Sequence, residues 1–219
     1  MSLSERIENL MMSVQKPVRY MGGEFNAVMK DPDKVDVRYA FLFPDTYEVG
    51  MSHLGMKILY HAINARDDAW CERVFSPWVD MADMMRRDDI PLFSLESRTP
   101  VKEFDLLGIT LQYEMSFTNI LEALDLAGIP LRSADRSDGP FVICGGPCAF
   151  NPEPLAPFVD LVASATARRR PCRPSTCTSS GRPRACPGRN TCAWRRRFPA
   201  STCRRCMTSS TTTTAPWNP

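Results

Sequence analysis

Apolar and polar positions between Met1 and Val162 follow two alternating patterns. Short runs of continuous apolar residues, about five residues long, are typical of buried β-strands. Longer stretches, in which apolar residues recur every three or four positions, are typical of helices that pack on one side. The predicted strands cover residues 37–43, 73–75, 92–95, 105–112, 141–144 and 159–162. The predicted helices cover residues 2–14, 53–65, 78–87 and 116–127.

Strands that alternate with helices predict βαβ units, in which a parallel sheet has helices on both faces. The expected fold class is therefore α/β. We expect an N-terminal helix and lead-in at residues 1–36 and a Rossmann-like parallel sheet at residues 37–162. A disordered tail should follow at residues 163–219.

Three strand-to-helix loops should form one edge of this sheet. They lie at residues 45–52, 114–116 and 145–151. Because the strands are expected to be parallel, their carboxyl ends meet at the same edge, which is where ligands bind in such folds. Within these loops, Ser52 could cap the helix that follows it.

Charge changes abruptly after Asp160. All 25 acidic residues and 15 of the 27 basic residues lie at or before this position, so the chain up to Asp160 carries a net charge of −10. The part after Asp160 carries +12, all from arginine, and holds six of the nine cysteines. After Val162 the chain has no Leu, Ile, Val, Lys, Asp or Glu. A segment of that composition cannot bury a hydrophobic core, which predicts disorder.

A one-base shift of the reading frame near residue 163 would account for this change. Residues 164–170 can be encoded so that the shifted frame reads I-G-D-G-E-E-A, which continues the apolar residues 159–162 into a strand and a Gly–acid loop. We therefore expect the tail to be read out of frame, and we assign its six cysteines no ligand role. Two alternatives remain: an Arg-rich arm that binds nucleic acid, and a zinc site built on Cys203 and Cys206.

Two stretches resemble a known family. The sequence G-G-P-C-A-F-N-P-E at residues 145–153, followed by residues 159–162 and the restored I-G-D-G-E-E, resembles cobalamin-domain radical SAM proteins. In those proteins this segment ends a B12-binding-type domain and leads into the radical SAM barrel. The opening is similar to a bacterial group of such proteins without an assigned substrate, through R-Y-M-G-G-E-F-N at residues 19–26 and P-D-T-Y-E-V-G-M-S-H-L-G at residues 44–55. The resemblance covers residues 15–162.

The resemblance implies a parent enzyme that carries a [4Fe–4S] cluster on a C-x3-C-x2-C loop and cleaves S-adenosylmethionine to a radical. No cysteine of this chain has that spacing, because residue 151, which would complete Cys144 and Cys148, is Asn. We therefore expect a truncated accessory domain that holds no cofactor of its own and is inactive alone. We assign no catalytic and no metal-binding residue.

Cobalamin is the ligand that the resemblance implies for this region. Ligation of cobalt by histidine uses D-x-H-x-x-G after the first strand, but here Met51 takes the place of Asp and a glycine follows His53 by two residues. We expect His53 to start a helix, although family members that bind cobalamin without a histidine ligand exist. Gly145 and Gly146 suit either close approach of the backbone to a ligand or a tight turn. The cofactor-binding candidates are Ser52, His53, Gly145, Gly146 and Pro147.

Three functions follow from these patterns: an accessory domain of a radical SAM enzyme, a stand-alone module that binds cobalamin or a nucleotide, and a tail that binds nucleic acid or zinc. Nucleic acid is not the partner that we expect. The chain has no secretory signal and no run of about 18 apolar residues that could cross a membrane, so a cytoplasmic location is expected. The oligomeric state is not indicated by the sequence.

Overall fold

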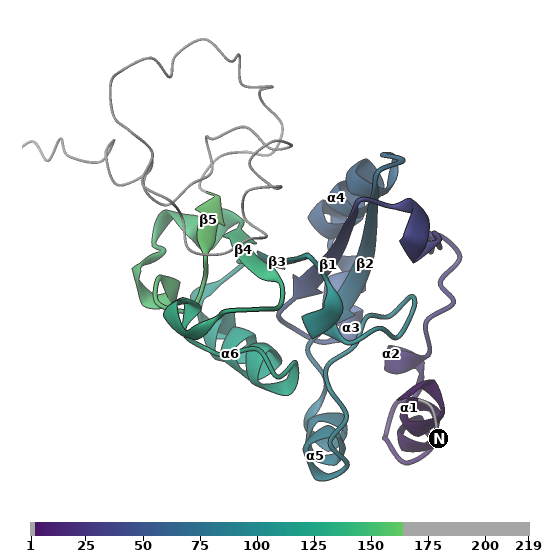
Figure 1. Cartoon of the computed structure of the whole chain (residues 1–219). Coiled ribbons are helices and arrows are strands. Elements are labelled where there is room, and N and C mark those ends of the chain that lie inside the picture. The colour runs from purple at the N-terminus through teal and green to yellow at the C-terminus, as the bar shows by residue number, and fades with distance from the viewer. Residues whose placement is uncertain (1–2, 164–219) are drawn as a thin grey trace, which may run out of the picture.

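The computed structural model describes residues 3–163, which form a five-stranded parallel sheet with the strand order β2-β1-β3-β4-β5. All four strand pairs are parallel, as Figure 1 shows. The Rossmann-like α/β fold is therefore confirmed. The strands are β1 (Val37–Phe43), β2 (Ala69–Phe75), β3 (Leu106–Thr110), β4 (Phe141–Gly145) and β5 (Leu161–Ala163).

Six helices surround or precede these strands in the described part of the chain. They are α1 (Leu3–Met11), α2 (Val18–Met21), α3 (Tyr47–Ser52), α4 (Leu54–Asn64), α5 (Val79–Arg87) and α6 (Phe117–Leu126). Short 3-10 turns lie at Pro32–Lys34, Val101–Glu103, Glu114–Ser116, Ser133–Asp135, Pro147–Phe150 and Glu153–Leu155. No helix among these residues is long and apolar enough to cross a membrane.

The side chains of β1 alternate between two faces of the sheet. Phe41 and Phe43 point to one face, where Met56 and Tyr60 of α4 cover them. We call this the α4 face. Ala40 and Leu42 point to the opposite face, called the α6 face. There α1, α5 and α6 pack together below the strands in Figure 1, whereas α4 lies above them. Helices on both faces are therefore confirmed.

Several predicted elements differ from the structure, among them the N-terminal helix, which ends at Met11 and not at residue 14. The second strand begins at Ala69 and not at residue 73, because it pairs with β1 along its whole length. Residues 92–95 form no strand, and Phe93 makes a single antiparallel bridge to Pro100. The loop expected at residues 45–52 contains α3, which ends at Ser52. Of the predicted tail, all residues after Ala163 lie outside the described part of the chain.

The lead-in segment before β1 follows the outer side of β2. The indole Nε1 of Trp70 donates a hydrogen bond of 2.9 Å to the Val28 carbonyl. Lys30 Nζ donates hydrogen bonds to the carbonyls of Asn64, at 3.0 Å, and Ala69, at 2.7 Å. Carbonyls at the end of α4 thus gain a cationic partner, which is favourable at a helix C-terminus.

Candidate functional site

The loops after β1, β2 and β3 are joined at the carboxyl edge of the sheet. The Tyr113 hydroxyl donates a hydrogen bond of 3.1 Å to Asp45 Oδ2, and Asn119 Nδ2 donates one of 3.0 Å to the Pro44 carbonyl. The Ser76 amide donates a bond of 3.0 Å to the Asp45 carbonyl. In a sheet with this strand order the connections reverse direction between β1 and β3, and ligands bind in the crevice at that point. Asp45 and Tyr113 stand on its two sides.

Ser52 and His53 lie at the junction of α3 and α4, each one position away from its expected role. Ser52 is the last residue of α3, and its hydroxyl donates a bond of 2.7 Å to the Val49 carbonyl. His53 is the cap of α4, since its Nδ1 accepts a bond of 3.2 Å from the Met56 amide. The expectation that Ser52 caps this helix is wrong, because α3 extends through Ser52 and leaves the extended conformation to His53. The His53 ring also packs on Phe43, with 5.3 Å between ring centroids.

Gly145 and Gly146 differ in what surrounds them. Gly146 has a φ of +125°, and a Cβ placed there would lie 2.5 Å from the Leu111 carbonyl oxygen. Packing against the chain itself therefore requires glycine at this position. A Cβ on Gly145 would meet only Ala163, at 3.6 Å or more, which is ordinary contact. Pro147 begins the 3-10 turn that follows.

The cofactor-binding candidates form two groups at the carboxyl edge of the sheet, one after β1 and one at the end of β4. His53 packs on Phe43, which is on the α4 face of β1. The strand register places Gly145 on the same face, because Gly145 pairs with Thr110 and the residues of the α4 face alternate along β3. Strand β3 lies between the two groups. The sheet therefore brings His53 and Gly145 to one face and one edge, with Thr110 between them.

Sequence reasoning missed the contacts that hold the lead-in segment against this edge. The Tyr47 hydroxyl donates a hydrogen bond to the Glu24 carboxylate. Burial and this carboxylate raise the pKa of Tyr47 to about 12. Arg19 Nε donates to both oxygens of Glu48 at 2.9 Å. The two N-terminal motifs that resemble the family, residues 19–26 and 44–55, therefore contact each other. Only the resemblance of both motifs to the same family could have suggested this contact.

A buried ion pair at β2 was also missed. Glu72 is fully buried on the α6 face, where it accepts a bond of 2.6 Å from Arg38 Nη2 and one of 2.8 Å from the Ser94 hydroxyl. The neighbouring Arg73 pairs with Glu96 at 2.6 Å. Burial raises the pKa of Glu96 despite this partner. Both carboxylates tie the segment at residues 94–99 to β2, which is an edge strand, so these pairs have a structural role.

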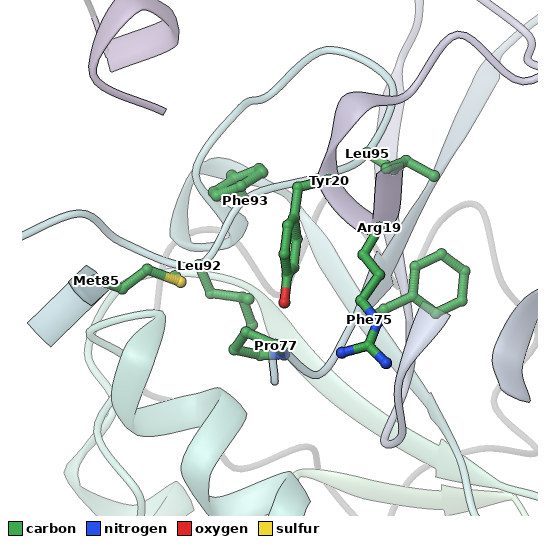
Figure 2. A pocket seen from close by; sticks show the side chains of 8 residues that line it. All are labelled: Arg19, Tyr20, Phe75, Pro77, Met85, Leu92, Phe93 and Leu95. Atoms are coloured by element: carbon green, nitrogen blue, oxygen red, sulfur yellow. The ribbon is translucent and has the colours of Figure 1, made fainter. Parts of the chain in front are cut away.

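Two hollows of the described residues are lined by neither Asp45 nor Tyr113, which flank the switch point. One cavity of about 20 Å³ is lined by residues of the lead-in segment and of the segments after β2, and Figure 2 shows the Tyr20 hydroxyl and the Arg19 guanidinium pointing toward Pro77. Such a volume holds about one water molecule. A shallow hollow of about 570 Å³ lies near the amino ends of the strands and is lined by Lys102 and Gly128, among others.

Desolvation raises the pKa of all three cysteines of the described residues. Cys71 and Cys144 are fully buried, and burial raises the pKa of Cys144 to about 12. Desolvation also raises the pKa of Cys148. Because metals bind the thiolate, a raised pKa opposes binding. Within residues 3–163, no group of three or more His, Cys, Asp or Glu residues could hold a metal ion.

The strand order and the joined loops define a doubly wound α/β domain with a switch point between β1 and β3. Residues 55–166 match the family described as Radical SAM proteins, N-terminal. This match covers just over half of the chain, and the chain therefore belongs to that family. No curated protein and no solved structure matches the chain. The expected relationship to radical SAM proteins is confirmed at the level of the family.

Proposed function

We propose that residues 3–163 are the accessory domain of a radical SAM protein and that this chain is catalytically inactive by itself. The observation that carries the proposal is the match of residues 55–166 to an N-terminal family of radical SAM proteins. The sheet also has a topological switch point between β1 and β3, where ligands bind in folds of this kind. In this role the domain binds and positions, while another part of the parent protein supplies the radical chemistry.

The cysteines support the inactive state. A radical SAM cluster needs three thiolates close together, with one iron left open to the cofactor. No three cysteines of the chain have the C-x3-C-x2-C spacing. Cys71 lies in β2 and Cys144 in β4, two strands that are separated by β1 and β3. These two thiols therefore cannot share a cluster.

The change of composition after Ala163 supports a shift of reading frame there. The test is to resequence the gene across codons 155 to 175. One additional base that restores I-G-D-G-E-E would support the proposal, because the domain would then continue into the acidic loop of its relatives. An unchanged DNA sequence, together with an intact mass equal to that of the full chain as written, would contradict the frame shift.

An activity assay tests the proposal on the protein itself. The purified chain is treated with iron, sulfide and a reductant, and S-adenosylmethionine is added. We expect no cluster absorption and no 5′-deoxyadenosine. The same assay on the product of the frame-restored gene should give both. Formation of 5′-deoxyadenosine by the chain as written would refute its inactivity.

A second candidate function is the binding of cobalamin at the carboxyl edge. The open position beside Gly145 and the His53 ring on the same face favour it, because His53 Nδ1 is occupied by the Met56 amide while its Nε2 makes no hydrogen bond among the described residues. Cobalamin would supply a cobalt centre able to carry a methyl group. The roles of the chain would be to hold the corrin against the edge and to exclude water from one side of it.

Titration of hydroxocobalamin into the chain, followed by visible absorbance and equilibrium dialysis, tests this second function. Gly145→Val should weaken binding by filling the open position. If His53 ligates cobalt, His53→Ala should remove the nitrogen splitting from the electron paramagnetic resonance spectrum of bound cob(II)alamin. His61→Ala is the matched control, since His61 is exposed on α4 and is the other histidine of the chain. Absence of retention in dialysis would reject cobalamin.

A further inference from the structure

Three large apolar side chains stand exposed on the loops after β3 and β4. Met115 is 84% exposed and Phe150 is 87% exposed, while Tyr113 is 43% exposed. We call these three residues the carboxyl-edge patch. Exposed apolar side chains that are grouped in this way mark interaction surfaces, and aromatic residues and methionine are enriched in the centres of protein interfaces.

The two loops of the patch are joined by backbone hydrogen bonds. The Leu111 amide donates a bond of 2.6 Å to the Gly145 carbonyl, and the Cys148 amide donates one of 3.2 Å to the Leu111 carbonyl. These bonds bring the start of the Tyr113–Met115 loop next to the turn that carries Phe150. The two loops that carry the patch residues are therefore held together by backbone hydrogen bonds near the ends of their strands.

The chain leaves the sheet beside this surface. Strand β5 is parallel to β4, and its last residue, Ala163, pairs with Gly145. The carboxyl end of β5 therefore lies at the same edge as the patch. The family match ends at residue 166, shortly after Ala163. Whatever follows this domain in members of the family therefore begins at the same edge of the sheet as the patch.

We propose that the carboxyl-edge patch is the docking surface for the radical SAM domain that follows this region in members of the family. This inference rests on the proposed function as an accessory domain. Because the next domain is tethered close to this surface, its effective concentration there is high. A modest interface therefore suffices to hold the two domains together. Methionine suits such a surface because its flexible side chain adapts to the opposing one.

The residues 164–219 of this chain are a poor occupant of the same surface by composition. They contain no Leu, Ile or Val and carry twelve arginines. An apolar patch is matched by apolar side chains, since burial of apolar surface is the main favourable contribution. A second copy of the chain is the other alternative, and the experiment separates both from the radical SAM domain.

The test uses the full chain and the C-terminal portion of an intact family member, expressed without its N-terminal region. Binding is measured by isothermal titration calorimetry. The double variant Met115→Ser, Phe150→Ser should weaken binding at least about tenfold, because central apolar contacts dominate interfaces. The matched control is Met12→Ser, Met29→Ser, which removes two apolar side chains at 85% and 62% exposure from the segments before β1. This control should bind like the original chain.

Peroxide footprinting gives an independent measurement that does not require a variant. In the chain alone, Met115 and Met12 should oxidise at similar rates, because their exposed fractions are 84% and 85%. Addition of the C-terminal portion should protect Met115 and leave Met12 unchanged. Protection of Met115 in the chain alone would overturn the proposal in favour of the tail or a second copy, and light scattering would distinguish a dimer.

The docking surface and the accessory function can fail separately. If the C-terminal portion forms a cluster and cleaves S-adenosylmethionine but binds the chain equally with and without the Met115 and Phe150 side chains, the docking surface is wrong and the accessory function stands. If that portion forms no cluster, the proposed function fails together with the inference.

Discussion

The phenol of Tyr113 donates a 3.1 Å hydrogen bond to Asp45 Oδ2 and so connects the loops after β3 and β1. These two strands are neighbours in the sheet but distant in the chain, since β1 ends at Phe43 and β3 begins at Leu106. The contact therefore depends on the fold and not on local sequence. The Asp45 carboxylate raises the pKa of the Tyr113 phenol, mainly through its negative charge. At the switch point of the sheet, the Asp45 carboxylate on one side therefore accepts a hydrogen bond from the Tyr113 phenol on the other side.

Alkaline titration should detect this contact. All five tyrosines have a pKa raised above the ordinary value of about 10, from burial in most cases and from Asp45 in the case of Tyr113. Absorbance at alkaline pH should therefore show no phenol that ionises at its ordinary pKa. In Asp45→Asn, one phenol should ionise at lower pH, because the negative charge beside Tyr113 is gone.

The same shifts predict how stability depends on pH. The unfolded chain loses phenolic protons at a lower pH than the folded chain, since the pKa values are raised only in the folded state. Stability is therefore fully present below about pH 10 and falls as the pH rises through the folded pKa values. Urea unfolding at neutral pH and above about pH 10 checks the sign. A stability that increases in the alkaline range would contradict the burial of these phenols.

Gly145 and Gly146 should respond differently to the same substitution. Gly146→Ala should destabilise the domain by about 2 kcal/mol or more, because alanine is strained at a φ of +125° and its Cβ would meet the Leu111 carbonyl. Gly145→Ala should change stability by less than about 1 kcal/mol, since its Cβ makes only ordinary contacts. Urea unfolding with unchanged m-values measures both. Equal losses in the two variants would show that the β4 turn packs differently.

Glu72 should be critical for stability because its carboxylate is buried against Arg38. Glu72→Gln removes the charge that faces Arg38 Nη2 at 2.6 Å, in a site where the glutamate is fully buried. Loss of one partner from a buried ion pair costs roughly 3 kcal/mol, because the other charge stays desolvated. Glu103→Gln is the matched control, since Glu103 is exposed, and it should stay within about 0.5 kcal/mol. A small loss at Glu72 would indicate that water reaches Arg38.

Much of the sheet could be predicted from the sequence because its strands are buried on both faces. The apolar run at Val37–Phe43 matches β1 at both ends, and the runs of β3, β4 and β5 were found within a few residues. Alternation of such runs with amphipathic helices is the direct signature of a parallel sheet. The first four residues of β2 were not predicted as strand because they include Glu72, and a charged residue is unusual inside a buried strand. The structure pairs this carboxylate with Arg38 of the neighbouring strand β1.

The candidate site was predictable only in part. The gathering of the three loops follows from parallel strands, but the order of those strands does not follow from the hydrophobic pattern. The contacts Tyr47–Glu24 and Arg19–Glu48 join positions that are far apart in the chain, and no local signal identifies such partners. The cap of α4 was predicted one residue too early, because serine is by residue type the better cap. In the structure, α3 includes Ser52, so His53 is the residue with the extended backbone that a cap requires.

Substitution at this cap should separate His53 from Ser52. His53→Ala removes the acceptor of the Met56 amide and should destabilise the domain by about 1 kcal/mol, the usual value for a lost N-cap. Ser52→Ala should stay within about 0.5 kcal/mol, because its exposed hydroxyl only donates to the Val49 carbonyl. His53→Asp should recover most of the loss, since aspartate is a favoured cap and can accept the same amide hydrogen. Failure of this rescue would mean that the contact of the His53 ring with Phe43, and not the cap, supplies the stability. Urea unfolding of the four proteins decides between the two contacts, and it also shows whether a histidine that is offered as a cobalt ligand can be removed without loss of the fold.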